Sequence, residues 1–220
     1  MPDFLVLFDV DGTLVDSEAI IVDCMNAAFD VVSLPHPARR TVTSLVGLSL
    51  PRMVEALTPG ADLEVQATIT ATYRVRFAEA VANGAEPPLY PGVPDGLAAL
   101  RSAGFALGVA TGKSRRGLDR VVKAYGWDDL FVTQQCADFH PSKPHPSMVR
   151  RALAETAIAE DRAVMVGDTI FDIEMANAAD IPSIGVDWGY HEGERLSEAG
   201  AVAVVSDFES LVARIQEMSA

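Results

Sequence analysis

The stretch FLVLFDVDGTLVD, residues 4–16, carries the strongest fold signal in this 220-residue chain. The apolar run Phe4–Phe8 is followed at once by Asp9, Asp11 and Gly12. A continuous apolar run of this length is typical of a strand that is buried on both faces of a parallel sheet. The acidic residues would then lie just beyond the carboxyl end of that strand, which is where doubly wound sheets bind their ligands.

Further apolar runs repeat this layout, in which a short apolar segment is followed by small or polar residues and then by a helical pattern. They are Phe105–Ala110 before Thr111, Ala163–Val166 before Gly167, Pro182–Val186 before Asp187, and a final strand at Ala201–Val205 before a helix at Phe208–Met218. Alternation of buried strands and helices predicts an α/β fold with a doubly wound, Rossmann-like parallel sheet.

One segment breaks this alternation, because residues 17–88 show helical periodicity but no convincing strand. Apolar side chains recur there at helical spacing, at Ile20, Cys24 and Ala28 and again at Ile69, Tyr73 and Phe77. The segment is far longer than the connection of about 2–6 residues that usually joins a strand to a helix. We therefore predict an inserted α-helical domain over residues 17–88 and an α/β core domain formed by residues 1–16 and 89–220.

The composition argues against several classes of protein. With 31 acidic and 17 basic residues and a net charge of −14, the chain lacks the positive surface that binds nucleic acids and anionic membranes. Cys24 and Cys136 form neither a disulfide framework nor a CxxC metal site. No apolar run approaches the ~18 residues of a membrane span, and the N-terminus lacks the basic region of a signal peptide. We expect a cytoplasmic monomer or homodimer that binds neither nucleic acid nor membrane.

Candidate reactive residues gather after the predicted strands and in one loop. They are Asp9, Asp11, Thr111, Gly112, Lys143, Asp168 and Asp172. Asp9 and Asp168 would repel each other unless a cation lay between them, and oxygen ligands without His or Cys favour Mg²⁺. A carboxylate can attack phosphorus to form an aspartyl-phosphate, while a second carboxylate acts as general acid and then as base. Thr111 could hold phosphate oxygens, and Lys143 could neutralise the charge that develops on them.

This ordered set of motifs resembles the haloacid dehalogenase-like hydrolase superfamily over the whole chain. The segment at residues 17–88 resembles the helical cap of the subgroup that contains phosphoglycolate phosphatases and β-phosphoglucomutases. One position departs from the pattern, because Asp180 stands where the family usually has the glycine that ends a helix. Aspartate tolerates left-handed backbone geometry better than most residues, so the fold is not put in doubt.

The resemblance also implies a role for each candidate residue. Asp9 would be the nucleophile and Asp11 the general acid and base, while Thr111 and Lys143 would complete the catalytic set. Mg²⁺ would be held by Asp9, the backbone carbonyl of Asp11, and Asp168, with Asp172 in a supporting position.

Several activities are compatible with this resemblance. Asp11 argues against dehalogenation, and phosphonate hydrolysis through a cap lysine is excluded because residues 17–88 contain no lysine. We expect a phosphatase that acts on a small phosphorylated metabolite. A β-phosphoglucomutase-like sugar phosphomutase and a non-enzymatic, receiver-like phosphoacceptor remain as alternatives. The candidates for substrate binding are Gly112 and, in the insertion, Arg39 and Arg52. The two arginines could pair with a second anionic group of the substrate.

Overall fold

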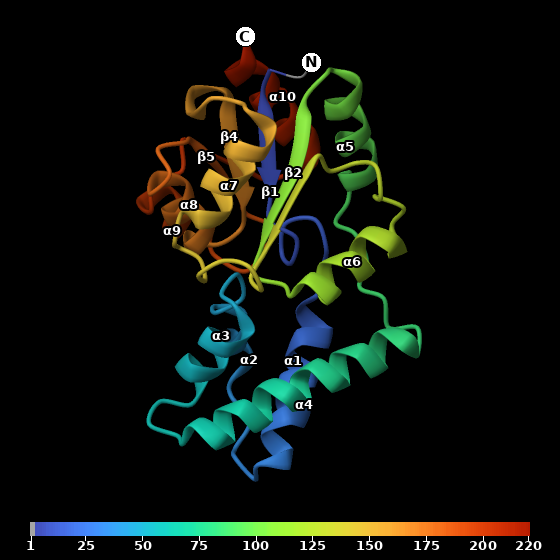
Figure 1. Ribbon diagram of the computed structural model, residues 1–220, viewed down its shortest axis with the longest axis vertical. Helices are drawn as coiled ribbons and strands as arrows, with labels where there is room; N and C mark the ends of the chain where they lie inside the picture. The colour runs from blue at the N-terminus through green and yellow to red at the C-terminus, as the bar shows by residue number, and fades with distance from the viewer. Residues whose placement is uncertain (1–2) are drawn as a thin grey trace.

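The computed structural model describes residues 3–220, and at its centre lies a six-stranded parallel sheet (Figure 1). The strands are β1 (Leu5–Phe8), β2 (Ala106–Thr111), β3 (Thr133–Cys136), β4 (Ala163–Gly167), β5 (Ser183–Val186) and β6 (Ala203–Val205). Their order in the sheet is β3-β2-β1-β4-β5-β6, so the chain builds outward first on one side of β1 and then on the other. The predicted doubly wound fold is confirmed, and its switch point lies between β1 and β4.

Helices cover both faces of this sheet. Alternate residues of a strand point to opposite faces, and accordingly Val6 and Phe8 join one hydrophobic cluster while Leu5 and Leu7 join another. The helices α5 (Val93–Ser102), α6 (Arg115–Ala124) and α10 (Phe208–Ser219) pack into the first cluster, and α7 (Ser147–Thr156) and α8 (Ile170–Asn177) pack into the second. A short helix α9 (Gly193–Glu198) packs on β5 and β6, and a 3₁₀ turn η1 (Glu160–Arg162) precedes β4.

Strand β3 is the one strand that the sequence pattern did not predict. It reads Thr133-Gln134-Gln135-Cys136, which contains no apolar run, and it lies at the edge of the sheet beside β2. Its polar side chains are satisfied locally, because Thr133 Oγ1 and Gln135 Nε2 each donate to Glu155 Oε2 of α7 at 2.7 Å. An edge strand of this kind gives no hydrophobic signal in the sequence.

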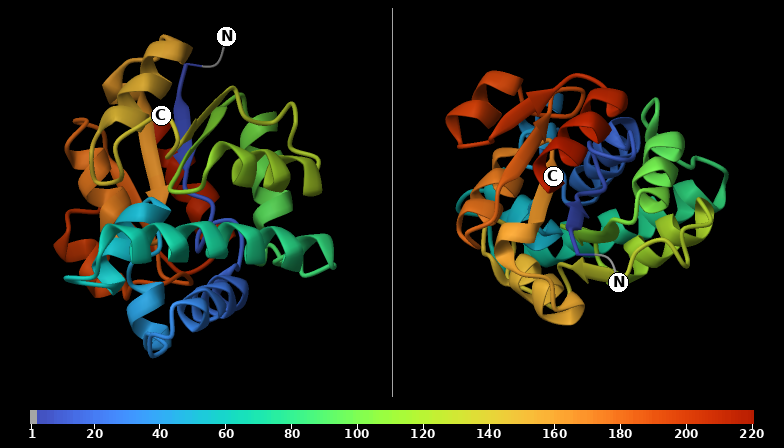
Figure 2. Two further views of the ribbon diagram at one scale, coloured as in Figure 1. Left: turned by 60° about the horizontal axis from the view of Figure 1, so that its bottom comes forward. Right: turned by 90° about the horizontal axis from the view of Figure 1, so that it is seen from above.

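Between β1 and α5 the chain forms the helices α1 (Glu18–Val31), α2 (Arg39–Thr43), α3 (Leu50–Leu57) and α4 (Leu63–Ala82). Figures 1 and 2 show these helices gathered at one end of the sheet. The chain leaves and re-enters the core at the same place, since the backbone N–H of Asp16 donates to the carbonyl of Pro88 at 2.8 Å. We call residues 17–88 the insertion; its bounds as a domain stay a prediction. Within residues 3–220, no helix has the length and apolar character needed to cross a membrane.

Candidate active site

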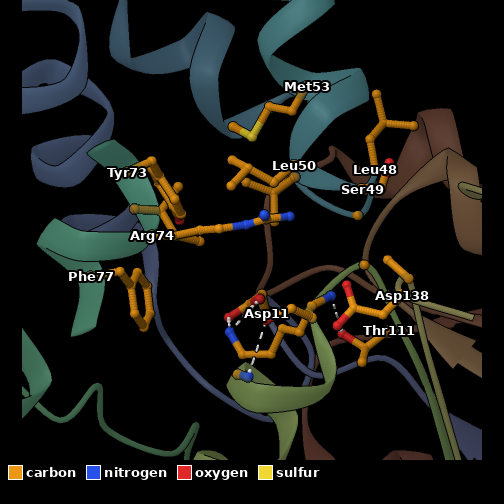
Figure 3. Close-up of a pocket in the computed structure, with 18 of the residues that line it drawn as sticks. Asp11, Leu48, Ser49, Leu50, Met53, Tyr73, Arg74, Phe77, Thr111 and Asp138 are labelled. Atoms are coloured by element: carbon orange, nitrogen blue, oxygen red, sulfur yellow. Dashed lines mark hydrogen bonds and ion pairs between the residues drawn. The ribbon is translucent and has the colours of Figure 1, made fainter. Parts of the chain in front are cut away.

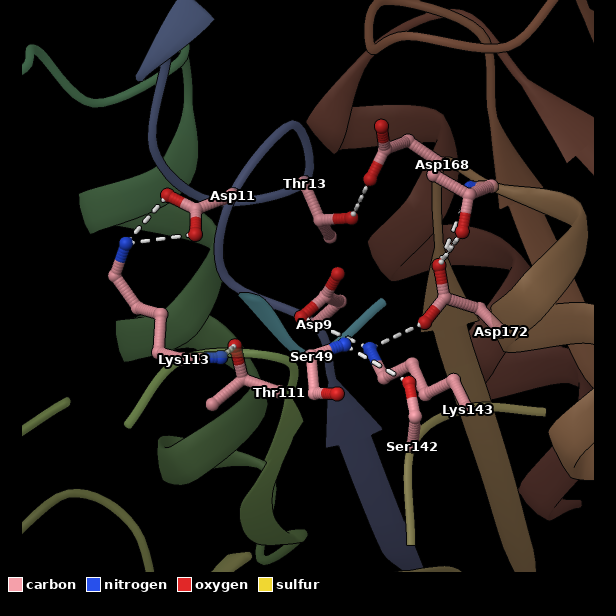
Figure 4. A network of polar contacts seen from close by, with 11 residues as sticks. Asp9, Asp11, Thr13, Ser49, Thr111, Lys113, Ser142, Lys143, Asp168 and Asp172 are labelled. Carbon is pink, nitrogen blue, oxygen red and sulfur yellow. Dashed lines mark hydrogen bonds and ion pairs between the residues drawn. The ribbon is translucent and has the colours of Figure 1, made fainter. Parts of the chain in front are cut away.

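The predicted polar residues lie together at the carboxyl edge of the sheet (Figure 4). Asp9 and Asp168 follow the neighbouring strands β1 and β4, and Thr111 ends β2 on the other side of β1. Lys143 comes from the loop between β3 and α7, and Asp172 comes from the first turn of α8. Because all these strands run parallel, their carboxyl ends bring residues from distant parts of the sequence to one place.

Lys143 is a fully buried cation between two carboxylates. Its Nζ lies 3.0 Å from Asp9 Oδ1 and 2.6 Å from Asp172 Oδ1. Burial alone would lower the pKa of Lys143, but the Asp172 and Asp9 carboxylates outweigh burial and raise that pKa above its ordinary value. The lysine is therefore protonated at neutral pH, and its charge is directed at Asp9.

Asp9 combines deep burial with unused acceptor capacity. It is 1% exposed, and among residues 3–220 neither carboxylate oxygen accepts a hydrogen bond of good geometry, although Lys143 lies at ion-pair distance. Burial raises the pKa of Asp9 to about 7; the charge of Lys143 opposes this shift, and the charges of Asp172 and Asp11 add to it. A buried carboxylate with bare oxygens can attack an electrophile or bind a cation.

The carboxylates of Asp9, Asp168 and Asp172 offer a group of oxygens that lie within 4.8 Å of one another. Burial raises the pKa of Asp168 well above its ordinary value, and the charges of Asp172 and Asp9 raise it further. A divalent cation would relieve this repulsion, and an all-oxygen donor set suits Mg²⁺. In Asp172, Oδ1 accepts from Lys143 at 2.6 Å and Oδ2 accepts from the backbone N–H of Thr169 at 3.2 Å. Asp172 therefore pairs directly with Lys143, whereas Asp9 is the member of this group whose two oxygens accept no hydrogen bond of good geometry among residues 3–220.

Two glycines allow the chain to close around Asp168. A Cβ at Gly12 would lie 2.2 Å from Asp168 Oδ2, and a Cβ at Gly189 would lie 2.3 Å from Asp168 Cβ. Asp168 also accepts hydrogen bonds from Thr13 Oγ1 at 2.8 Å and from the backbone N–H of Tyr190 at 2.9 Å. These contacts fix the orientation of the carboxylate, as is usual for groups that support a metal ligand.

Asp11 is held by a lysine to which the sequence reasoning gave no role. Lys113 Nζ lies 2.6 Å from each carboxylate oxygen of Asp11, and the Ser17 hydroxyl donates to Asp11 Oδ1. The same ammonium lies 5.3 Å from the centre of the Phe77 ring, which belongs to α4 of the insertion. The available signal was the position of Lys113, two residues after Thr111 at the end of an apolar run.

A cavity of about 270 Å³ lies between this edge of the sheet and the insertion (Figure 3). Asp9, Asp11 and Thr111 contribute to its lining from the core. The insertion lines it mainly with apolar side chains, which include Ile21, Val46, Leu48, Leu50, Met53, Tyr73 and Phe77. A molecule bound at Asp9 would therefore be covered by the insertion.

The insertion also touches the core directly through its loop at residues 47–49. The backbone N–H of Ser49 donates to Ser142 Oγ at 2.8 Å. Gly112, one of the predicted substrate-binding residues, lines the cavity and faces the same loop. A Cβ at Gly112 would lie 2.6 Å from the carbonyl oxygens of Gly47 and Leu48. Only a glycine therefore leaves room for the loop at this distance.

Arg39 and Arg52 do not line the cavity, which corrects the expectation that they read a second anionic group. Arg39 Nε pairs with Glu18 at 2.6 Å, and Arg52 pairs with Glu55, three residues along α3, at 2.6 Å. Both arginine side chains are mostly exposed. Their local carboxylate partners hold them on the outer surface of the insertion.

The sheet order and the buried carboxylates at its switch point define an α/β protein with an acidic site whose oxygens suit a divalent cation. Comparison with known proteins gives the family. Residues 6–186 match the family model described as haloacid dehalogenase-like hydrolase. The chain belongs to the haloacid dehalogenase-like hydrolase family, as the resemblance of its motifs implied.

Individual relatives cover nearly the whole chain. A protein from Dickeya dadantii named "Probable phosphatase IndB" is 36% identical, over 94% of this chain and 91% of the relative. A phosphoglycolate phosphatase from Psychrobacter arcticus is 31% identical, over 94% of each chain. The crystal structure of a predicted phosphatase from Clostridium acetobutylicum superimposes with a TM-score of 0.88 at 27% identity and covers 99% of this chain and 100% of that chain. Family and relatives together identify the protein as a hydrolase.

Proposed function

We propose that the protein is a Mg²⁺-dependent phosphatase that hydrolyses a small phosphomonoester through a phosphorylated Asp9. The buried Asp9 carboxylate carries this proposal, because it lines the cavity beside Asp11 and Thr111 and its oxygens accept no hydrogen bond of good geometry from residues 3–220. Relatives named phosphoglycolate phosphatase support a phosphomonoester as the substrate.

In the first half-reaction an oxygen of Asp9 attacks the phosphorus, and the bond between the phosphorus and the ester oxygen breaks. Asp11 in its protonated form gives its proton to the departing oxygen and becomes a carboxylate, so that an alcohol leaves instead of an alkoxide. Lys143, which lies 3.0 Å from Asp9, neutralises charge on the non-bridging oxygens, and the Thr111 hydroxyl can hydrogen-bond one of them.

In the second half-reaction water attacks the phosphorus of phosphorylated Asp9. Asp11, now ionised, accepts a proton from that water, and the bond between the phosphorus and Asp9 breaks to release inorganic phosphate. The ion pair with Lys113 and the hydrogen bond from Ser17 hold the Asp11 carboxylate in place for this step.

Asp9, Asp168 and the backbone carbonyl of Asp11 would hold the Mg²⁺. The ion, when bound, supplies positive charge that offsets the carboxylates and the phosphoryl oxygens. Asp172 contributes indirectly, because it holds Lys143 at 2.6 Å and thereby positions the ammonium beside Asp9.

Phosphate release from a panel of phosphomonoesters, including 2-phosphoglycolate and hexose phosphates, tests the proposal. We expect turnover with Mg²⁺, none in EDTA, and recovery when Mg²⁺ is returned. With a labelled aryl phosphate, Asp9→Asn should form no phosphoenzyme, whereas Asp11→Asn should still be phosphorylated because an aryl leaving group needs no proton. Full activity in EDTA, or equal and substantial activity in both variants, would contradict the proposal.

The two alternative functions predict different products in the same assay. A β-phosphoglucomutase-like enzyme would interconvert hexose phosphates with little release of phosphate. A receiver-like phosphoacceptor would keep a stable phosphoryl group without turnover. Steady release of phosphate from one ester would therefore favour the phosphatase over both.

A further inference from the structure

Three arginines line the cavity without a carboxylate partner. Among residues 3–220, Arg74, Arg116 and Arg120 form no ion pair, whereas the other cavity cation outside the Asp9 site, Lys113, is paired with Asp11. We call Arg74, Arg116 and Arg120 the arginine group.

The arginine group comes from two opposite walls of the cavity. Arg116 and Arg120 are one turn apart on α6 and therefore share a face of that helix. Arg74 comes from α4 of the insertion, and Figure 3 shows its side chain reaching across the cavity between Leu50 and Asp11. All three residues line the same cavity, Arg74 from the insertion and the other two from the core.

Acidic residues at the cavity do not neutralise this group. The acidic residues that line it are Asp9, Asp11 and Asp138. Asp9 and Asp11 are paired with lysines, and Asp138 accepts a hydrogen bond from the backbone N–H of Arg115 at 2.8 Å. Among residues 3–220, none of these three carboxylates forms an ion pair with an arginine of this group.

Apolar side chains surround the same space. Tyr73 and Phe77 lie on the face of α4 that carries Arg74, and Leu50 and Met53 face them from the segment around α3. Such a wall favours an apolar ligand over water. The guanidinium group can bind a carboxylate or a phosphate with two parallel hydrogen bonds.

We infer that the substrate is a phosphomonoester whose leaving group has an apolar body and a second anionic group, and that the arginine group binds this anion. The inference rests on the proposed phosphatase function and names the class of ester on which it acts. The phosphoryl group would lie at Asp9, the apolar body against Tyr73 and Phe77, and the carboxylate or second phosphate at the arginines.

Three alkyl esters with related leaving groups test the inference. Benzyl phosphate has a ring and no second anion, 4-carboxybenzyl phosphate has both, and 2-phosphoglycolate has the carboxylate without the ring. We expect kcat/KM for 4-carboxybenzyl phosphate to exceed each of the other two by about tenfold, which corresponds to about 1.4 kcal/mol. 4-Phosphonobenzyl phosphate then shows whether the arginine group prefers a carboxylate or a phosphate-like anion.

Matched variants connect this preference to the arginine group. Arg74→Gln, Arg116→Gln and Arg120→Gln should each reduce the preference for 4-carboxybenzyl over benzyl phosphate, and the triple variant should abolish it while benzyl phosphate changes less than about twofold. The controls are Arg76→Gln on α4 and Lys123→Gln on α6, which remove a charge from the same helices outside this cavity. Neither control should alter the preference.

The outcomes separate this inference from the proposed function. Hydrolysis of benzyl and 4-carboxybenzyl phosphate with equal kcat/KM, or equal loss of preference in the controls, would overturn the arginine group as an anion site. A clear preference for 2-phosphoglycolate over 4-carboxybenzyl phosphate would contradict the inference that the leaving group has an apolar body. Absence of phosphate release from every ester in the presence of Mg²⁺ would overturn the phosphatase function itself.

Discussion

At the scale of single residues, the ionisation of Asp9 links the stability of the protein to pH. The pKa of Asp9 is about 7 in the folded protein, whereas an unperturbed aspartate has a pKa of 3.8. The folded state therefore binds a proton more tightly than the unfolded state does. It follows that the contribution of Asp9 to the free energy of unfolding of the metal-free protein decreases as the pH rises from about 4 to about 7.

This linkage predicts that Asp9→Asn stabilises the metal-free protein more at pH 8 than at pH 5. The amide removes a buried charge that is present only at the higher pH, and Lys143 keeps its partner Asp172. We expect the gain in Tm in EDTA to be larger at pH 8 by roughly 3 °C or more, as measured by differential scanning calorimetry. Mg²⁺ should then raise the Tm of the wild type more than that of the variant. A gain of the same size at both pH values, or in the exposed control Asp128→Asn, would contradict this reasoning.

Residues in the site differ in how visible they are in the sequence. Asp9, Asp11 and Asp168 could be predicted because each lies at or just after the end of an apolar run, and strand ends converge in a parallel sheet. The arginine group could not be predicted in this way, because helical periodicity does not show which polar residues face a cavity. Arg39 and Arg52 were chosen for their place in the insertion, yet nearby glutamates pair with them.

At the scale of secondary-structure elements, the close approach of the loop at residues 47–49 to the end of β2 depends on a missing side chain. Gly112→Ala should introduce a clash with the carbonyls of Gly47 and Leu48, which lie 2.6 Å from the position of the new Cβ. Strain of about 1–3 kcal/mol in the state in which this loop lies against the core would raise KM roughly 5- to 150-fold. The Tm should change little, because the loop can withdraw without disturbing the sheet.

Ser142→Ala provides the comparison for this change, since it removes the acceptor of the Ser49 N–H but adds no bulk. We expect it to raise KM less than Gly112→Ala does. If Gly112→Ala binds substrate as the wild type does, the loop does not need to approach the core during the reaction.

The elements themselves were largely predictable, and the exceptions have physical causes. The buried strands β1, β2, β4 and β5 lie within the apolar runs identified in the sequence or end one residue beyond them. Strand β3 lacks such a run, because its polar side chains bond to α7 at the edge of the sheet. The left-handed backbone of Asp180, with φ of 59°, confirms that aspartate adopts the geometry expected of a glycine there.

At the scale of the whole molecule, the two ends of the insertion lie side by side. Val15 pairs with Leu89 in an antiparallel bridge, and Asp16 N–H donates to Pro88 at 2.8 Å. Replacement of residues 17–87 by a short Gly-Ser linker should therefore leave a folded core, with cooperative unfolding by circular dichroism. This core should release phosphate from p-nitrophenyl phosphate slowly and show little preference among leaving groups. An aggregated or non-cooperative product would show that the core needs the insertion in order to fold.

The net charge of the whole chain predicts which partners it does not bind. Because the chain has a net charge of −14, we expect it to bind neither nucleic acid nor anionic vesicles. Binding assays with each of these ligands measure this directly. The monomeric or homodimeric state and the cytoplasmic location likewise stay predictions. Light scattering after gel filtration tests the oligomeric state, and cell fractionation tests the location.

The membership of the hydrophobic clusters predicts that the insertion and the core are separate cooperative units. The buried members of the third cluster, among them Met25 and Ile69, all belong to the insertion, and the buried members of the other two all belong to the core. The insertion can consequently loosen on heating without exposing the interior of the sheet, as a partial unfolding that amide hydrogen exchange would detect first in α1 and α4. Recognition of the leaving group would then be lost at a lower temperature than the fold of the core. In a thermally stressed cell, such a protein would lose selectivity before it lost solubility.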